Sequence, residues 1–186
     1  MALWLWQFWT YSFLGFLLEK AFAAATGSAR RARRCFLLLP LCPVYGLGAL
    51  AVLALPPALT DSFWGLAVWG GLAATAVEYA VHWGYEAAFG VRFWDYGQVW
   101  GNLRGRVCVP FSLAWGVLLA AGLPPVQGWL APRLAAIPPQ LTYAALLLFT
   151  ADALLSARLL YRTGEAESVR PPLFRAGREP PAQPEA

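Results

Sequence analysis

Apolar residues occur along this chain in long runs separated by short polar stretches, a pattern typical of helices that cross a membrane. Such a helix needs about 20 mostly apolar residues to cross the hydrocarbon of a bilayer. Runs of this kind are Leu3–Ala25, Phe36–Leu55, Ser62–Phe89, Val107–Leu123 and Leu141–Tyr161. We therefore predict an all-α integral membrane protein with about five transmembrane helices.

Composition supports this class. Of the 186 residues, 59% are hydrophobic and 13% are charged, whereas a soluble domain has about 25% charged residues. The first run lacks a basic n-region and contains Trp4, Trp6 and Trp9, so we expect a retained anchor rather than a signal peptide. We predict a polytopic transmembrane domain over residues 1–162 and a disordered cytoplasmic tail, rich in Pro, Arg and Glu, over residues 163–186.

The basic residues predict the orientation, because Lys and Arg near helix ends are retained on the cytoplasmic side. With the first loop inside, Arg133 alone is outside and the other 13 basic residues are inside. The prediction is an N-out, C-in protein of the bacterial cytoplasmic membrane, multi-pass. The net charge of +4 then reflects topology and contact with anionic lipids rather than with nucleic acid.

The second apolar run is interrupted by Pro40, Pro43 and Gly46. Proline removes a backbone donor and breaks the helical ladder, and inside a bilayer the freed groups must be satisfied by protein or by a water-lined cavity. Two interpretations follow: a proline-kinked helix, or a re-entrant lead-in with the helix proper starting after Pro43.

Polar residues concentrate between Glu78 and Trp115. Glu78, His82 and Glu86 are spaced four apart, which puts them on one stripe of the third helix. This favours a proton-handling or substrate-binding site, although a lone histidine is also typical of a packed core position. Near the inner end of the first helix, Glu19 either joins this site or marks the interface and pairs with Lys20.

The following loop contains Trp94, Asp95, Tyr96, Asn102 and Arg106. An aromatic belt at the membrane surface explains its Trp and Tyr residues but not Asp95 among them. Asp95 and Asn102, with Arg104 and Arg106 nearby, are expected to form a charge-assisted cluster that caps a pocket between helices.

The cysteines, Asp152 and the later prolines have simpler structural interpretations. Cys35, Cys42 and Cys108 have no metal-ligand spacing and lie toward the cytoplasm, where we expect no disulfide and interpret them as small buried residues. No metal or cofactor is predicted. Asp152 is expected to bond Ser156 or another helix. The prolines Pro124, Pro125, Pro132, Pro138 and Pro139 are assigned to the outer connection.

Three segments resemble the family of putative ABC-transporter permeases, type IV, which are small bacterial membrane proteins. They are FLGFLLEK from Phe13, RRCFLLLPLCPVYGLGAL from Arg33, and EYAVHWGYEAAFGVRFWDY from Glu78 followed by GNLRGRVCVPFSLAWG to Gly116. Where the family tends to have Asn-Arg-Gly and then Tyr-Gly-Pro, this chain has Arg33, Arg34, Cys35 and then Leu38, Leu39, Pro40. By resemblance the motif residues are Glu19, Arg34, Cys42, Pro43, Tyr45, Gly46, Glu78, Trp94, Asp95, Tyr96, Asn102, Gly105, Arg106 and Trp115.

The resemblance implies a permease-type subunit of an ABC transporter. The chain has no Gly-rich phosphate loop with its lysine, so ATP hydrolysis is expected from a cytosolic partner, and five helices favour a homo-oligomer. The predicted pocket residues are Glu19, Glu78, His82, Trp94, Asp95, Tyr96, Asn102 and Arg106. Two alternatives remain: an intramembrane enzyme acting on a lipid or isoprenoid, with Glu78 or Asp95 as acid or base and Arg106 holding a phosphate, and a membrane assembly factor.

Overall fold

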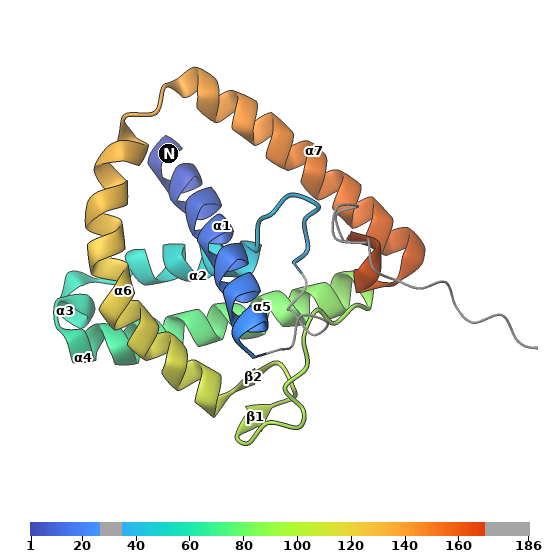
Figure 1. Ribbon diagram of the computed structural model, residues 1–186, viewed down its shortest axis with the longest axis horizontal. Helices are drawn as coiled ribbons and strands as arrows, with labels where there is room; N and C mark the ends of the chain where they lie inside the picture. The colour runs from blue at the N-terminus through green and yellow to red at the C-terminus, as the bar shows by residue number, and fades with distance from the viewer. Residues whose placement is uncertain (27–34, 170–186) are drawn as a thin grey trace, which may run out of the picture.

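The computed structural model describes residues 1–26 and 35–169 and is mostly helical, at 76%. The predicted arginine cluster at Arg30, Arg31, Arg33 and Arg34 and the tail from residue 170 lie outside the described residues. Figure 1 shows the elements, which in chain order are α1 (Ala2–Ala25), α2 (Pro43–Leu53), α3 (Pro57–Thr60), α4 (Phe63–Gly65), the π-helical η2 (Leu66–Gly70), α5 (Gly71–Phe89), β1 (Asn102–Leu103), β2 (Val107–Cys108), α6 (Val109–Ala135), α7 (Pro139–Thr163) and the 3₁₀-helix η3 (Ala166–Val169).

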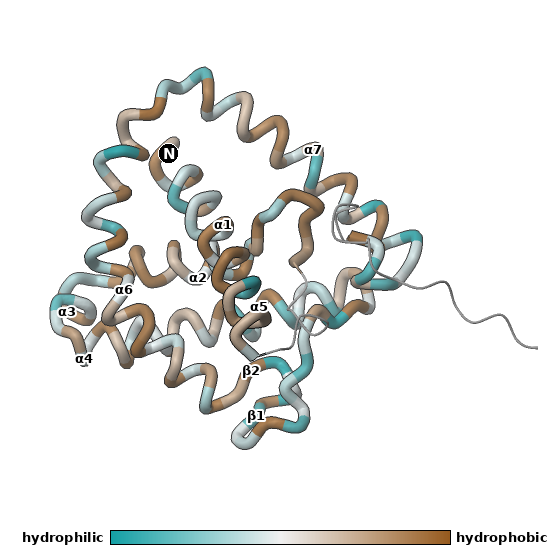
Figure 2. Tube along the Cα trace, in the orientation of Figure 1, coloured by the Kyte–Doolittle hydropathy of each residue, from teal (hydrophilic) through white to brown (hydrophobic). Residues whose placement is uncertain are grey.

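Among the described residues, two helices are long and apolar enough to cross a membrane, α6 and α7. The helix α1 is of similar length, with 24 residues, and carries Glu19 and Lys20 near its C-terminal end. Hydrophilic residues are frequent in the loop around β1 and β2 and at the C-terminal end of α7 (Figure 2). The helical class predicted from the sequence is confirmed at this level.

The second apolar run does not form a continuous helix. Residues 35–42 are non-helical, and α2 begins at Pro43 with Cys42 as its N-cap. This is the predicted lead-in followed by a helix, because proline suits the first helical position but breaks a helix interior. At 11 residues, α2 is about 16 Å long, so the span predicted at Phe36–Leu55 is too short as a helix to cross about 30 Å of hydrocarbon.

The lead-in is held by polar groups of two long helices. Leu38 N–H donates to Ser156 Oγ at 3.2 Å and Leu39 N–H donates to Asp152 Oδ2 at 3.3 Å. Cys42 N–H donates to the carbonyl of Ser12 at 2.9 Å. Asp152 and Ser156 therefore satisfy irregular backbone that has left the helical ladder. We predicted a hydrogen bond from Asp152 to Ser156 or to another helix. In the structure, Asp152 instead accepts from the backbone of this lead-in.

Cys35 and Cys42 form a disulfide, with their Cα atoms 4.9 Å apart. The prediction of no disulfide was therefore wrong for this pair. The bent lead-in brings the two residues together, a geometry that their spacing in the sequence does not reveal. Cys108 is a buried free thiol, as predicted.

The helix α6 continues through Pro124, Pro125 and Pro132, and ends at Ala135. The assignment of these prolines to the outer connection, with the helix ending near Leu123, was therefore wrong. An apolar face extends past them and buries Leu130 and Leu134 in the core shared with α1 and α2. Burial of this face offsets the lost backbone bonds, which membrane helices tolerate when neighbouring helices surround them.

Small residues allow close approach between the helices. A Cβ atom built on Gly71 would lie 3.0 Å from the Cα of Gly116 on α6. A Cβ atom on Gly46 of α2 would lie 2.5 Å from the carbonyl oxygen of Phe8 on α1. Gly71 lies in the first half of the third apolar run, which is rich in glycine and alanine, and small residues of this kind favour close helix packing in membranes.

The chain stays ordered beyond the predicted domain boundary at residue 162. Gly164 adopts a left-handed conformation with φ of 63° and ends α7, as glycine does at many helix C-termini. Ala166 and Val169 of η3 are then buried in a second cluster with Val91, Phe93 and Leu160. This cluster packs the loop after α5 against the end of α7.

Candidate functional site

The loop between α5 and α6, residues 90–108, is shaped by two of its predicted site residues. Asp95 Oδ1 accepts from Gly97 N–H at 2.8 Å, which is an Asx-turn. Asn102 donates to the carbonyls of Gly97 and Val99 at 3.1 and 2.9 Å, and accepts from Gly105 N–H at 3.1 Å. Asp95 and Asn102 therefore stabilise the turns of this loop rather than a charged pair with arginine.

Gly105 of this loop is required to be glycine for two reasons. Gly105 has φ of 70°, which is costly for other residues. A Cβ atom there would also collide with Asp95 Oδ1. The N–x–x–G–R motif thus combines an amide that organises the loop, a glycine that fits the turn and an arginine that reaches the helix.

Trp94 makes one hydrogen bond within the loop and one with His82 of α5. Trp94 Nε1 donates to the carbonyl of Arg106 at 2.8 Å, and His82 Nε2 lies 2.9 Å from the carbonyl of Trp94. Since a carbonyl only accepts, His82 donates from Nε2. Its Nδ1 atom is buried and has no hydrogen-bond partner among the described residues. His82 thus supports the loop.

Tyr96 connects the loop to the buried carboxylate of α5. Its hydroxyl donates to Glu78 Oε1 at 3.1 Å, and Glu78 is only 3% exposed. The Tyr96 ring stacks on Phe111 of α6, with centroids 5.1 Å apart. Tyr96 therefore joins α5, the loop and α6 at one point.

Arg106 is bound by two side chains of α5. It donates to Glu86 Oε2 and to the Tyr79 hydroxyl, each at 2.8 Å, and lies over the Tyr79 ring. Arg92 also pairs with Glu86, at 2.5 Å. The hydrogen bond to Glu86 raises the pKa of Arg106 above its already high value, so the guanidinium stays charged and fixes the end of the loop.

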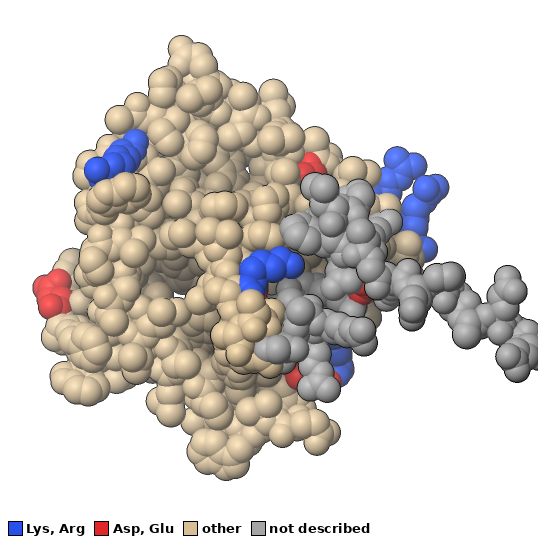
Figure 3. All heavy atoms as spheres, viewed as in Figure 1, with Lys and Arg blue, Asp and Glu red and all other residues tan. Residues whose placement is uncertain are grey.

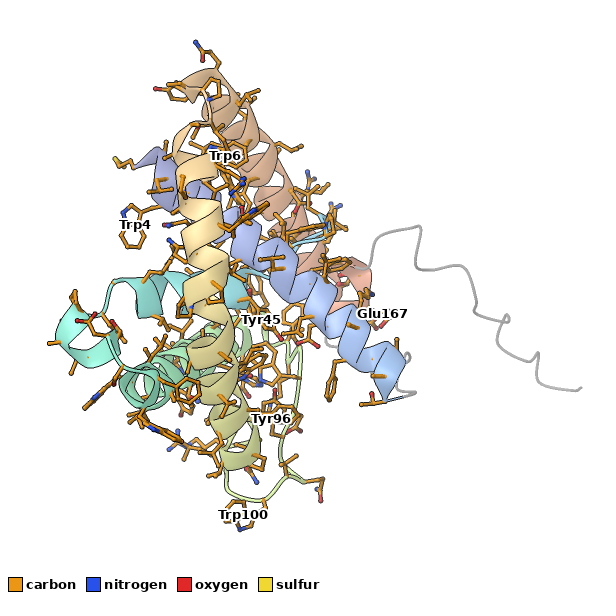
Figure 4. The ribbon with its side chains drawn as sticks, turned by 60° about the vertical axis from the view of Figure 1, so that its left-hand side comes forward. Trp4, Trp6, Tyr45, Tyr96, Trp100 and Glu167 are labelled. Atoms are coloured by element: carbon orange, nitrogen blue, oxygen red, sulfur yellow. A yellow bond between two sulfur atoms is a disulfide. The ribbon has the colours of Figure 1, made fainter. Side chains whose placement is uncertain are left out.

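A second tyrosine and carboxylate connect α1 and α2. The hydroxyl of Tyr45, on α2, donates to Glu19 of α1. The Tyr45 ring meets the edge of Trp115 on α6, with centroids 5.3 Å apart. Gly15 leaves room for Tyr45, since a Cβ atom there would occupy the position of its ring. Figure 4 shows Tyr45 and Tyr96 one below the other beside α6.

Two adjoining cavities lie between α1, α2, α5, α6 and the loop. The apolar chamber has a volume of about 280 Å³ and is lined mostly by aliphatic and small residues of α1, α2 and α6, with Glu78 in its wall. The polar chamber, of about 540 Å³, has a mostly aromatic and aliphatic wall to which Glu19, Asp95 and Tyr96 add polar groups. Both are bordered by Leu18, Tyr45, Trp115 and Leu118, so the chambers are neighbours.

The predicted site residues fall into two groups in the structure. Glu19, Glu78, Trp94, Asp95 and Tyr96 line the cavities, whereas His82, Asn102 and Arg106 line neither and hold the loop in place. The helix-break residues Pro40, Pro43 and Gly46 shape the lead-in and α2 rather than either wall.

The predicted pocket omitted Tyr45 and Trp115, which form the boundary between the chambers. Both were among the motif residues of the resembling family. Neither is charged, so a search for polar residues within apolar runs passes over them. Within residues 1–26 and 35–169, no three His, Cys, Asp or Glu side chains are grouped to hold a metal ion.

The described part of the chain is mostly helical and has two helices long and apolar enough to cross a membrane. The chain belongs to the family described as putative ABC-transporter type IV, which it matches over residues 6–157. No curated protein and no solved structure matches it.

Proposed function

We propose that this protein is the membrane-embedded, permease-type subunit of an ABC transporter. The observation that carries the proposal is the pair of adjoining cavities, with two Tyr–Glu pairs in their walls, in a chain of this family. Discontinuous helices that line a polar cavity are a common feature of transporter binding sites. The short α2 with its non-helical lead-in fits that pattern.

The energy comes from a separate cytosolic ATPase. The chain has one lysine, Lys20, which is not part of a Gly-rich phosphate loop. Membrane lipids and a second copy of the chain are the other proposed partners. No nucleic acid is involved.

The proposed topology is five crossings, N-out and C-in, in the bacterial cytoplasmic membrane, the second being made by the non-helical lead-in together with α2. Residues 1–162 form the transmembrane domain and residues 163–186 a cytoplasmic tail. In Figure 3, charged side chains lie at the left edge and in the right half of the view, with one basic side chain near its middle, and uncharged surface covers most of the rest. The loop after α5 and the polar chamber are then on the cytoplasmic half.

The test combines partner capture with a transport assay. Tagged protein is purified from native membranes, and we expect an ABC-type ATPase to co-purify. In vesicles of the complex, ATP-dependent flux should be lost in Glu78→Gln, because the neutral amide changes the hydrogen bond with Tyr96. Glu165→Gln, at an exposed position after α7, is the control. Absence of an ATPase partner, or flux that is equal in both variants, would contradict the proposal.

The contacts of Arg106 and Asp95 disfavour the alternative of an intramembrane enzyme in which these two residues act on the substrate. Arg106 is bonded to Glu86 and Tyr79, so its guanidinium is already engaged. Asp95 accepts from Gly97 within the loop. Turnover of a labelled lipid by the purified protein, lost in Asp95→Asn, would nevertheless favour an enzyme.

A further inference from the structure

The helices α1 and α6 touch at two levels and separate between them. At one level the Tyr11 hydroxyl donates to Gln127 Oε1 at 2.8 Å. At the other the rings of Phe22 and Phe111 meet edge to face, with centroids 6.3 Å apart. The residues between these levels form a window in the side of the molecule, bordered by Leu14 and Leu18 of α1 and Leu118 of α6.

The residues of this window are both cavity-lining and exposed. Leu14 and Leu18 are each 38% exposed and Leu118 is 46% exposed, while all three line the apolar chamber. The chamber wall is thus also the outer surface of the helix pair. Since this surface consists of leucine, it faces lipid in a membrane protein, and the chamber opens sideways toward the bilayer.

The chamber behind the window has unfilled space. Gly48 of α2 and Gly122 of α6 both line it, and a Cβ atom on either would meet no atom within 4 Å. Gly48 is nevertheless buried from solvent. Protein interiors rarely leave such room, and about 280 Å³ is near the lower end of ligand pockets, which range over roughly 300–1,000 Å³.

Polarity increases from the apolar chamber to the polar chamber, and Leu18 and Leu118 of the window border both. The apolar chamber meets the polar chamber at Tyr45 and Trp115, and the polar chamber adds Glu19, Asp95 and Tyr96. A ligand that matches this succession has an apolar chain at one end and a hydrogen-bonding head at the other. The apolar chamber is the smaller of the two, at about 280 Å³ against about 540 Å³, so we assign it a single chain.

We propose that the two chambers bind a single-chain amphiphile that enters from the membrane through the window between α1 and α6. Its chain lies in the apolar chamber beside Gly48 and Gly122, and its head lies in the polar chamber near Glu19 and Tyr96. The inference rests on the proposed function for its physiological meaning, since the amphiphile would be the substrate of the transporter.

The test is photolabelling of the purified chain alone in phospholipid vesicles, with a diazirine-bearing hexadecanol as the probe. We expect covalent label on Leu14, Leu18, Leu118 and Gly122, mapped by mass spectrometry, and competition by unlabelled hexadecanol. Gly122→Leu fills the chamber, so labelling there should fall about tenfold or more. Gly128→Leu is the matched control, because Gly128 is on the same helix with open space at its Cβ and lies outside the cavity.

Thermal unfolding of each variant shows that the protein is folded before labelling is compared. Equal labelling in Gly122→Leu and Gly128→Leu would mean contact with bulk lipid only and would overturn the inference. A dimer whose window residues stay unlabelled would overturn it too, because a second copy would then be the occupant. The assay contains no ATPase, so a failure here leaves the capture of an ATPase partner as an independent result.

Discussion

At the scale of residues, two tyrosines give this site its form. Tyr45 bonds Glu19 and Tyr96 bonds Glu78, each linking a different pair of segments across the cavity. A buried carboxylate is costly unless it accepts hydrogen bonds. The tyrosines therefore have a structural role as well as any contact they make with a ligand.

Replacing Tyr96 by phenylalanine removes one hydrogen bond to the buried Glu78 and keeps the ring that stacks on Phe111. We expect a loss of stability of about 1–2 kcal/mol, as for a buried acceptor that loses a donor. The measurement is thermal unfolding in detergent micelles. Tyr143→Phe, at a residue 68% exposed on α7, should unfold at the wild-type temperature. Equal unfolding of both variants would mean that the bond to Glu78 contributes nothing.

At the scale of elements, the non-helical lead-in to α2 is the unusual feature. Backbone that leaves the helical ladder at membrane depth must be satisfied by protein groups. Asp152 and Ser156 of α7 supply acceptors, and Ser12 of α1 supplies a carbonyl. The polar residues of α7 are thereby explained without a part in catalysis or ligand binding.

Asp152→Leu removes the acceptor for Leu39 N–H and should destabilise the protein by about 1–3 kcal/mol, because a backbone donor remains buried without its partner. Asp152→Asn keeps a carbonyl oxygen at the same place and should lose much less. Hydrogen exchange at Leu39, followed by mass spectrometry, reports the bond directly. Exchange that is equally slow in both variants would show that another group holds the lead-in.

At the scale of the whole molecule, the distribution of charge sets the proposed orientation. Asp61 follows α3 and Arg133 lies in the last turn of α6. Most of the other basic residues lie in or near the loops of the opposite side according to the proposed topology. The polar chamber lies beside the loop after α5, and so its side of the membrane follows from the same orientation.

Single cysteine reporters test that orientation in intact cells. Asp61→Cys and Arg133→Cys should react with a membrane-impermeant maleimide, whereas Gln98→Cys and Glu165→Cys should react only after the membrane is opened. The native thiols give a low background, because Cys108 is buried and Cys35 and Cys42 are bonded to each other. The reverse pattern of labelling would invert the proposed topology.

The apolar runs and motifs were enough to predict a mostly helical protein, the positions of most long helices and the family. Apolar runs must bury their backbone bonds within a helix, and FWDY with N–x–x–G–R is a specific motif, so these inferences need no tertiary contacts. The sequence also located the polar loop and five residues that line the cavities, because polar groups in apolar surroundings are conspicuous.

Only the tertiary structure decided what each of these residues does. Asp95 and Asn102 bond their own loop, Arg106 bonds α5, and Asp152 bonds a segment 113 positions away in the chain. The Cys35–Cys42 disulfide and the passage of α6 through its prolines likewise depend on how segments pack. A side chain's residue type states which bonds it can make, but its partner is set by which segments the fold brings within about 3 Å.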